Sequence, residues 1–159
     1  MSIAKVVAIH LCAKTGGSPT PQESVNAIAH KGLEGDRFFG AIRNGQSRPE
    51  KAVTLIQAET IEALKVMGLV LEPGETRRNI TTRGVDLNAL VNRRFKVGEA
   101  ILEGYELCDP CFVLEKRTGK KLRELLENRG GLRAYIRQSG VIRIDDAIEV
   151  DDLKGRGDG

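Results

Sequence analysis

The sequence predicts a mainly β fold, built as a closed or nearly closed β-barrel with a few peripheral helices. Short segments with strand-like alternation recur along the chain and are separated by turn residues, and 18 of the 159 residues are glycine. Helical periodicity is confined to two segments. Many short strands with only two helices are typical of a barrel.

Seven strands are expected from alternation of apolar and polar residues. In the first strand, Val7, Ile9 and Leu11 are expected to share one side. Gly98-Glu99 and Ser139-Gly140 have the composition of tight turns between neighbouring strands. The predicted strands are Lys5–Leu11, Ala52–Ile56, Arg94–Val97, Ala100–Leu107, Ala134–Gln138, Val141–Ile144 and Ala147–Val150.

The two predicted helices each combine an apolar stripe with end signals. The first covers Gln57–Met67 and stops at Gly68. The second begins with Thr118 as its N-cap and ends at Gly130-Gly131, which reads as a helix stop or an anion-binding nest. The stripes are Ala58, Ile61 and Leu64 in the first helix and Leu122, Leu125 and Leu126 in the second.

The segment between Leu11 and Ala52 has little periodicity and many glycines, so we expect a long functional loop. A chain of 159 residues is long enough for one domain, which we place at 1–150, with a polar tail at 151–159.

Composition excludes several classes of function. The net charge of +3 permits an anionic small molecule, but there is no long basic run and only 4% of residues are aromatic, so we expect no nucleic acid. The apolar run near the N-terminus is too short for a membrane span, so no membrane partner is expected. Three cysteines, an odd number, argue against a disulfide framework and for a reducing compartment, the cytoplasm.

The motif Cys108-Asp109-Pro110-Cys111 is the first candidate for chemistry. A zinc site would need further ligands, and Cys12, His10 and His30 have spacings that match no zinc module. A thioredoxin-like dithiol would need a βαβ context, which is missing here. The alternative is two half-buried thiols in the barrel wall. Because Pro110 fixes the backbone before Cys111, the strand is expected to end there and present the thiol, which favours a functional role.

A polar run at residues 75–84 is the second candidate. Its arginines bind phosphate in a forked geometry, and its amide and hydroxyl groups add neutral donors. On a strand, successive residues of this run would face opposite sides. The alternative is a solvated edge strand with a basic turn, and we expect Arg78 and Asn79 to matter little to folding. The candidate binding residues are Arg78, Asn79, Thr81 and Thr82.

A glycine-flanked turn at residues 31–40 is the third candidate. Asp36 can cap neighbouring backbone amides, or form a surface pair with Arg37. We interpret His10 and His30 as structural or surface residues.

The order of these motifs closely resembles the MOSC domain, the C-terminal domain of molybdenum-cofactor sulfurases, which also occurs alone in bacteria and inside mitochondrial amidoxime-reducing proteins. The resemblance extends from about Lys5 to Val150. It depends on these segments: Gly32-Leu33-Glu34-Gly35-Asp36-Arg37, Ala52-Val53-Thr54-Leu55-Ile56, Pro73-Gly74, Arg78-Asn79-Ile80-Thr81-Thr82-Arg83-Gly84-Val85-Asp86-Leu87, Val97-Gly98, Cys108-Asp109-Pro110-Cys111 and Arg129-Gly130-Gly131-Leu132-Arg133-Ala134.

The resemblance implies a β-barrel with a cleft for the molybdenum cofactor (molybdopterin) or a sulfur-bearing intermediate. Cys111 aligns with the family's cysteine, which in the amidoxime-reducing relatives binds molybdenum. The pterin phosphate would be held by Arg78, Asn79, Thr81 and Thr82, and Lys14 lies near the position of a family lysine that contacts the cofactor. Phe38 stands where many relatives have histidine, and Ile144-Asp145-Asp146 replaces the usual Gly-Asp before the last strand.

Three functions stay open. The first is a cofactor-binding or sulfur-carrier module, as in a sulfurtransferase, with Cys111 as metal ligand or persulfide carrier. The second is a molybdenum-dependent reductase that needs an external electron-transfer protein. The third is a non-catalytic module that binds a small anion. The sequence has no room for the aminotransferase-like domain of the larger sulfurases, so pyridoxal phosphate would act only through a separate partner, a cysteine desulfurase.

Overall fold

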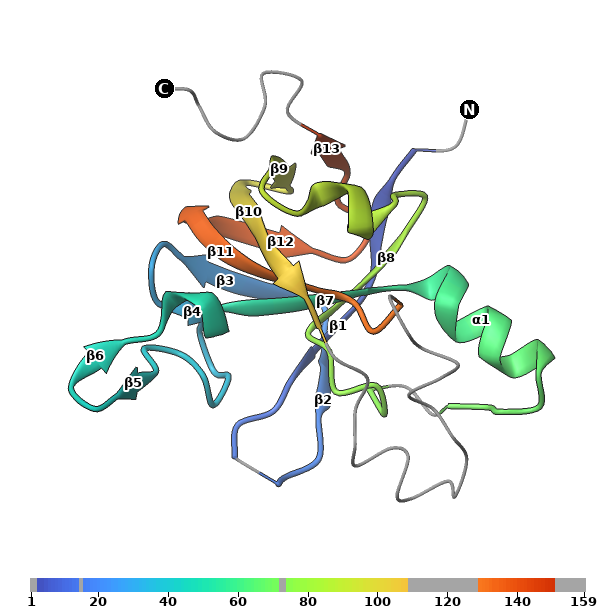
Figure 1. Cartoon of the computed structure of the whole chain (residues 1–159), viewed down its shortest axis with the longest axis horizontal. Helices are drawn as coiled ribbons and strands as arrows, with labels where there is room; N and C mark the ends of the chain where they lie inside the picture. The colour runs from blue at the N-terminus through green and yellow to red at the C-terminus, as the bar shows by residue number, and fades with distance from the viewer. Residues whose placement is uncertain (1–2, 15, 72–73, 109–128, 151–159) are drawn as a thin grey trace.

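The computed structural model describes residues 3–14, 16–71, 74–108 and 129–150, and it confirms a mainly β fold. An eight-stranded sheet forms most of the structure (Figure 1). Its strands, in spatial order, are β13 (Ile148–Val150), β9 (Arg94–Val97), β10 (Ala100–Leu107), β11 (Leu132–Gln138), β7 (Val53–Gln57), β8 (Ile80–Arg83), β1 (Lys5–Leu11) and β2 (Thr20–Gln22).

The segment expected to be a long loop contains five short strands. The strands β3 (Ser24–Ile28) and β4 (Gly32–Leu33) join β12 (Gly140–Arg143) in a second sheet, and β5 (Ile42–Arg43) pairs with β6 (Gln46–Ser47). The five strands β2 (Thr20–Gln22) to β6 are two to five residues long, which is too short to give a readable alternation of apolar and polar residues. The segment is therefore a set of small strands rather than an unstructured loop.

The barrel is not closed. The two ends of the eight-stranded sheet, β13 and β2, do not pair with each other. The sheet does curl back on itself, because Ile148 N–H donates to Ala4 O at 2.8 Å and Val6 N–H donates to Asp146 O at 2.9 Å. Contact between the start of β1 and the entry to β13 brings the sheet close to closure without completing a strand ladder.

A single α-helix, α1 (Ala58–Val66), lies among the described residues, with two short 3₁₀ helices, η1 (Pro49–Lys51) and η2 (Leu87–Leu90). The helix α1 ends within a residue of the predicted bounds, and Gly68 follows it with a φ of 96°. The second predicted helix, from Thr118, lies outside the described residues. No helix in the described part of the chain is long and apolar enough to cross a membrane.

The core lies between the curled large sheet and the small β12–β3–β4 sheet, and Phe95, Leu33 and Leu102 are fully buried in it. The first strand departs from simple alternation. A register shift between Val6 and Ala8 turns Val6 into the core, while Val7 is only half-buried. The expectation that Val7 and Ile9 share one side of the strand is therefore wrong, because Ile9 is buried and Val7 is only half-buried.

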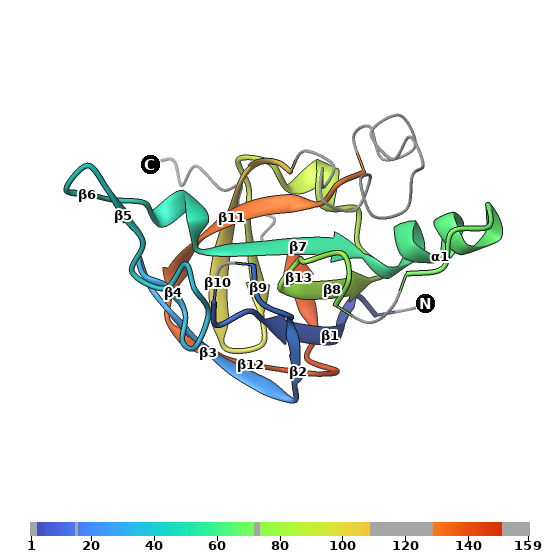
Figure 2. The ribbon, with the colours of Figure 1, turned by 90° about the horizontal axis from the view of Figure 1, so that it is seen from below.

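The strand β7 runs across the molecule from η1 to α1, with the β5–β6 hairpin at one end and α1 at the other (Figures 1 and 2). It pairs with β11 on one side and with β8 on the other, and the β7–β8 pair is parallel. The strand β8 lies between β7 and β1, so the interpretation of this run as a solvated edge strand is wrong. The last residue of β7 leads directly into α1.

Candidate functional site

A cavity of about 170 Å³ lies over β7, where five cationic side chains converge. We call it the arginine pocket. Lys51 ends η1, Arg133 lies on β11 opposite Thr54 of β7, and Arg77 and Arg78 immediately precede β8. The full lining is Asp36, Arg37, Phe38, Lys51, Thr54, Arg77, Arg78, Asn79 and Arg133. Five cationic groups and one carboxylate make this pocket suited to an anion.

The lone carboxylate of the pocket, Asp36, is occupied by structural donors. Asp36 is 7% exposed, and its Oδ1 accepts from Cys12 N–H at 3.0 Å and from Asn79 Nδ2 at 3.3 Å. Its Oδ2 accepts from Phe38 N–H at 3.2 Å. The expectation that Asp36 caps backbone amides is confirmed, whereas the alternative of a surface pair with Arg37 is not what the structure contains. The carboxylate therefore organises the pocket floor.

Asn79 is the second organising residue of the pocket. Its Oδ1 accepts from Thr54 N–H at 3.0 Å, and its Nδ2 donates to His10 O at 3.2 Å. Asn79 is 8% exposed, so these bonds are largely shielded from water. The expectation that Asn79 matters little to folding overlooked this role, because the neighbours that it bonds lie 25 and 69 residues away.

The two adjacent arginines are fixed by backbone carbonyls. Arg78 Nε donates to Gly130 O at 2.8 Å, and Arg77 Nη1 donates to Gly17 O at 3.1 Å. Arg77 has a φ of 61°, a conformation that is costly for a residue with a Cβ and that is often found at binding sites. Both guanidinium groups are thus positioned before any ligand arrives.

The remaining cations pack on an aromatic ring or on a surface carboxylate. The Arg37 guanidinium lies 4.4 Å and the Lys51 ammonium 5.6 Å from the centre of the Phe38 ring. Arg133 Nε lies 3.6 Å from Glu106 Oε2. Phe38 therefore serves as a platform for two positive charges.

The pocket contains two of the six residues that the sequence singled out, Arg78 and Asn79. Thr81 and Thr82 follow them into β8 and are buried, and the Thr82 hydroxyl bonds Ile56 O at 3.5 Å. Lys14 is exposed and is not part of the lining. Cys111 lies outside the described residues.

Six of the nine lining residues lie in the two segments singled out from the sequence, 31–40 and 75–84, and three do not. Lys51, Thr54 and Arg133 belong to segments that carry no separate binding signal, and they meet only because β11 pairs with β7 and η1 precedes β7. In the glycine-flanked turn, Asp36, Arg37 and Phe38 all line the pocket, although none of them was predicted to bind a ligand. Cys108, the first thiol of the CxxC motif, is 5% exposed, and its N–H donates to Gly131 O at 2.8 Å.

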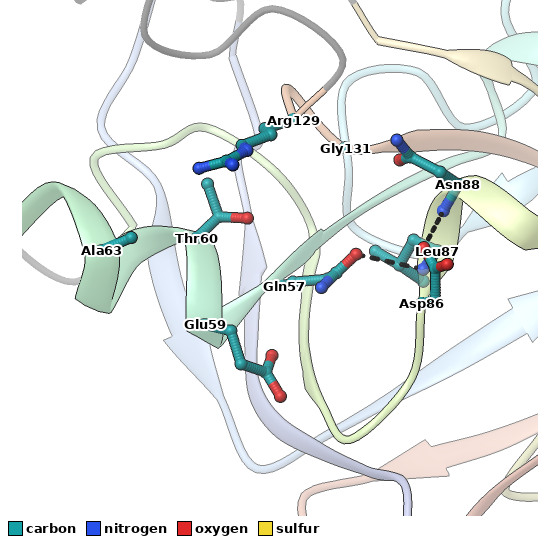
Figure 3. Close-up of a pocket in the computed structure, with 9 residues that line it drawn as sticks. All are labelled: Gln57, Glu59, Thr60, Ala63, Asp86, Leu87, Asn88, Arg129 and Gly131. Carbon is teal, nitrogen blue, oxygen red and sulfur yellow. Dashed lines mark hydrogen bonds between the residues drawn. The ribbon is translucent and has the colours of Figure 1, made fainter.

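A second cavity, of about 510 Å³, lies where β7 passes into α1 (Figure 3). We call it the larger cavity. The turn Gly130-Gly131, which we call the glycine turn, lies beside both cavities. Gly131 lines the larger cavity, and Gly130 O accepts a hydrogen bond from Arg78 of the arginine pocket. Its lining is Gln57, Glu59, Thr60, Ala63, Asp86, Leu87, Asn88, Arg129 and Gly131.

Comparison with known proteins gives a family and a fold. The family model described as "MOSC domain" matches residues 23–149. YuaD from Bacillus subtilis has a similar structure, with a TM-score of 0.75 and 17% identity over 94% of this chain and 96% of that one. YiiM from Geobacillus stearothermophilus gives a TM-score of 0.71 and 17% identity over 98% of this chain and 77% of that one. YiiM from Escherichia coli gives 0.67 and 18% over 93% and 70%. No curated protein matches.

Proposed function

The chain belongs to the MOSC domain family, and from this premise we propose that it binds a molybdenum cofactor. The arginine pocket would hold the phosphate end of the cofactor. Cys111 would hold the molybdenum or its sulfur.

The charge of the arginine pocket is the observation that carries the proposal. Its lining holds five cationic side chains and one carboxylate, and that carboxylate already accepts three hydrogen bonds. Forked guanidinium groups and a lysine are the groups that recognise phosphate oxygens. At about 170 Å³ the cavity is below the usual size of a pocket for a whole cofactor, about 300–1,000 Å³. A phosphate group fits this space, and the pterin would extend beyond it.

The route from the pocket to the thiols runs along the glycine turn. Arg78 bonds Gly130 O, and the next residue, Gly131, accepts from Cys108 N–H. Cys111 comes three residues after Cys108 in the sequence, and three residues span at most about 10 Å of extended chain. This spacing supports a ligand held by the arginines at one end and by the Cys111 thiol at the other.

The remaining candidates have different supports. Lys14 is exposed two residues from Cys12, whose N–H bonds Asp36, so we include Lys14 as an outer contact for the cofactor. Thr81 is included among the proposed cofactor contacts because it lies on β8, two residues after Asn79. The burial of the Thr82 hydroxyl against Ile56 O supports an indirect role, in which Thr82 fixes β8 and through it Asn79.

When bound, the molybdenum cofactor would supply the redox or sulfur chemistry, and the chain would bind and orient it. The hydrogen bonds of Asp36 and Asn79 keep the pocket floor in place, and the contacts of Arg77 and Arg78 with backbone carbonyls fix the positions of two guanidinium groups. Sulfur transfer would need a separate cysteine desulfurase with its pyridoxal phosphate, whereas reduction would need an electron-transfer protein. A plain small-anion module remains the alternative, because the pocket charge alone suits any small oxyanion.

The test is metal and pterin analysis of protein expressed in a host that makes the cofactor. We expect molybdenum and pterin to co-purify with the wild type. Arg78→Gln should lower pterin occupancy, since one charge-assisted contact is worth about 1.5–3 kcal/mol. Cys111→Ser should lose metal but keep pterin, because a hydroxyl does not replace the soft metal–sulfur bond.

The matched control is Arg143→Gln, because Arg143 pairs with Glu99 on the exposed surface at 3.2 Å and lies outside both cavities. It should keep wild-type occupancy. Protein from a competent host without metal or pterin would contradict the proposal. Persulfide on Cys111 without metal would support the sulfur-carrier form, and phosphate binding alone would support the anion module.

A further inference from the structure

The thiol of Cys12 is a buried group that the proposed function does not use. Cys12 follows β1 and is 4% exposed. Its backbone N–H donates to Asp36 Oδ1 at 3.0 Å, and its sulfur accepts from Arg77 Nη2 at 3.6 Å. Asp36 and Arg77 both line the arginine pocket. Cys12 therefore contacts two residues of the pocket, one through its backbone and one through its thiol.

The thiol carries its hydrogen, because it donates to backbone carbonyls nearby. Cys12 Sγ lies 3.0 Å from Lys14 O and 3.3 Å from Gly17 O, and Gly17 N–H donates to Lys14 O at 2.9 Å. A sulfur that donates in this way is uncharged, and it can still accept a hydrogen bond from a guanidinium. Cys12 is thus a neutral link between these carbonyls and Arg77.

Arg77 depends on such contacts because its own backbone is strained. Its φ of 61° is costly for a residue with a Cβ. Among the described residues, its guanidinium donates to Gly17 O at 3.1 Å and to Cys12 Sγ, which leaves three of its five N–H donors for other partners. Both of these acceptors are uncharged. They fix the guanidinium without cancelling the positive charge that attracts an anion, as a carboxylate in their place would do.

We propose that Cys12 is a positioning residue of the arginine pocket, and that its neutral thiol fixes the Arg77 guanidinium and so raises the affinity of the pocket for a phosphate group. The inference rests on the proposed function, because it takes the arginine pocket as the phosphate site. Cys111 would hold the molybdenum or its sulfur, whereas Cys12 acts only through Arg77. Since sulfur is a weak acceptor, loss of the thiol should matter less than loss of the Arg77 charge.

The experiment is a double-mutant cycle on the affinity of the full chain for inorganic phosphate, measured by phosphorus NMR titration at low salt near pH 7.5. Cys12→Ala should raise the dissociation constant about three- to tenfold, and Arg77→Gln about tenfold or more. When Arg77→Gln is already present, Cys12→Ala should change the dissociation constant by less than about twofold, because the two residues are coupled. A general loosening of the fold would instead give the same loss in both backgrounds.

Ile142→Val is the matched control. Like Cys12→Ala it removes one buried heavy atom, and it does so on β12, outside both cavities. It should leave phosphate affinity unchanged. Cys12→Ser goes through the same cycle in case Cys12→Ala does not fold. Its loss should be no larger than that of the alanine variant, since a hydroxyl can still donate and accept, and it should also disappear in the Arg77→Gln background.

Unchanged phosphate affinity in Cys12→Ala, an equal loss with and without Arg77, or an equal loss in Ile142→Val would overturn the proposal. So would a wild type that binds no phosphate at millimolar concentration. The two proposals fail separately. Additive losses in a protein that retains molybdenum and pterin would overturn the role of Cys12 alone, whereas coupled losses in a protein that never retains pterin would overturn the cofactor proposal alone.

Discussion

The Asn79 side-chain nitrogen lies 3.3 Å from Asp36 Oδ1, although 43 residues separate the two in the sequence. This bond joins the glycine-flanked turn after β4 to the start of β8. It also means that the floor of a strongly cationic pocket is an uncharged amide bonded to a carboxylate.

Asn79→Ala should therefore lower the stability of the protein as well as its ligand binding. The change leaves Thr54 N–H without its side-chain acceptor and Asp36 without one donor, both in a buried setting. We expect a loss of about 1–3 kcal/mol in the free energy of unfolding, measured by denaturant titration.

The control for this change is Asn26→Ala, which removes an exposed side-chain bond to Glu34. It should alter the free energy of unfolding by less than about 0.5 kcal/mol. Equal effects of the two substitutions would show that Asn79 has no special structural role.

Gly131→Ala should be more destabilising than Gly40→Ala. Both glycines have positive φ, 110° and 66°, so alanine is strained at both by about 1–2 kcal/mol. A Cβ at Gly131 would in addition overlap Leu55 O, whereas a Cβ at Gly40 meets nothing within 4 Å. Thermal melts of the two variants give the comparison, and a smaller loss for Gly131→Ala would contradict the close packing of the glycine turn against β7.

The pKa of His10 is lowered by burial, and stability should depend on pH for this reason. A histidine that is neutral in the folded state takes up a proton more readily when unfolded. The unfolded chain then binds more protons, so the free energy of unfolding falls as pH drops below about 6.5, the unperturbed value.

The loss of unfolding free energy on acidification should be smaller in His10→Gln than in His30→Gln, because His30 is exposed. Denaturant titrations at pH 7.5 and 5.5 measure the difference for each variant. If His10→Gln loses as much stability on acidification as the wild type, burial of His10 is not the cause.

Alkylation at limiting reagent should label Cys111 before the other two thiols. Cys12 and Cys108 are 4% and 5% exposed, and the Cys12 thiol also donates to Lys14 O at 3.0 Å. Buried thiols react slowly with a bulky reagent, so peptide mapping should find Cys111 modified first. Preferential labelling of Cys12 would argue against Cys111 as the functional cysteine.

The sequence predicted the strands with clear alternation, and the structure shows why the others were missed. Arg94–Val97 and Ala100–Leu107 have the predicted bounds, because one side of each faces the core. The strand β8 was considered for the polar run, but its burial was not predicted, because Asn79, Thr81 and Thr82 are buried although they are polar. Their hydrogen-bond partners come from distant strands, which no local pattern reveals.

The candidate site was predicted in the same uneven way. Arg78 and Asn79 were found because they lie in one polar run, but Lys51 and Arg133 join them only through strand pairing. The larger cavity was not predicted, although Gly131 belongs to the Gly130-Gly131 pair that the sequence offered as an anion-binding nest. Its charged lining residues, Glu59, Asp86 and Arg129, are far apart in the sequence and look like ordinary surface residues there.

The contact between Ala4 and Ile148 has a consequence for circular permutation of the chain. Because Ile148 N–H bonds Ala4 O, the first and last described strands lie side by side. A short covalent link between them would span little distance, and new ends could be opened at the exposed turn Asn44-Gly45 between β5 and β6. A circular permutant of this kind would keep every strand pair of the large sheet while changing the order in which those strands are synthesised.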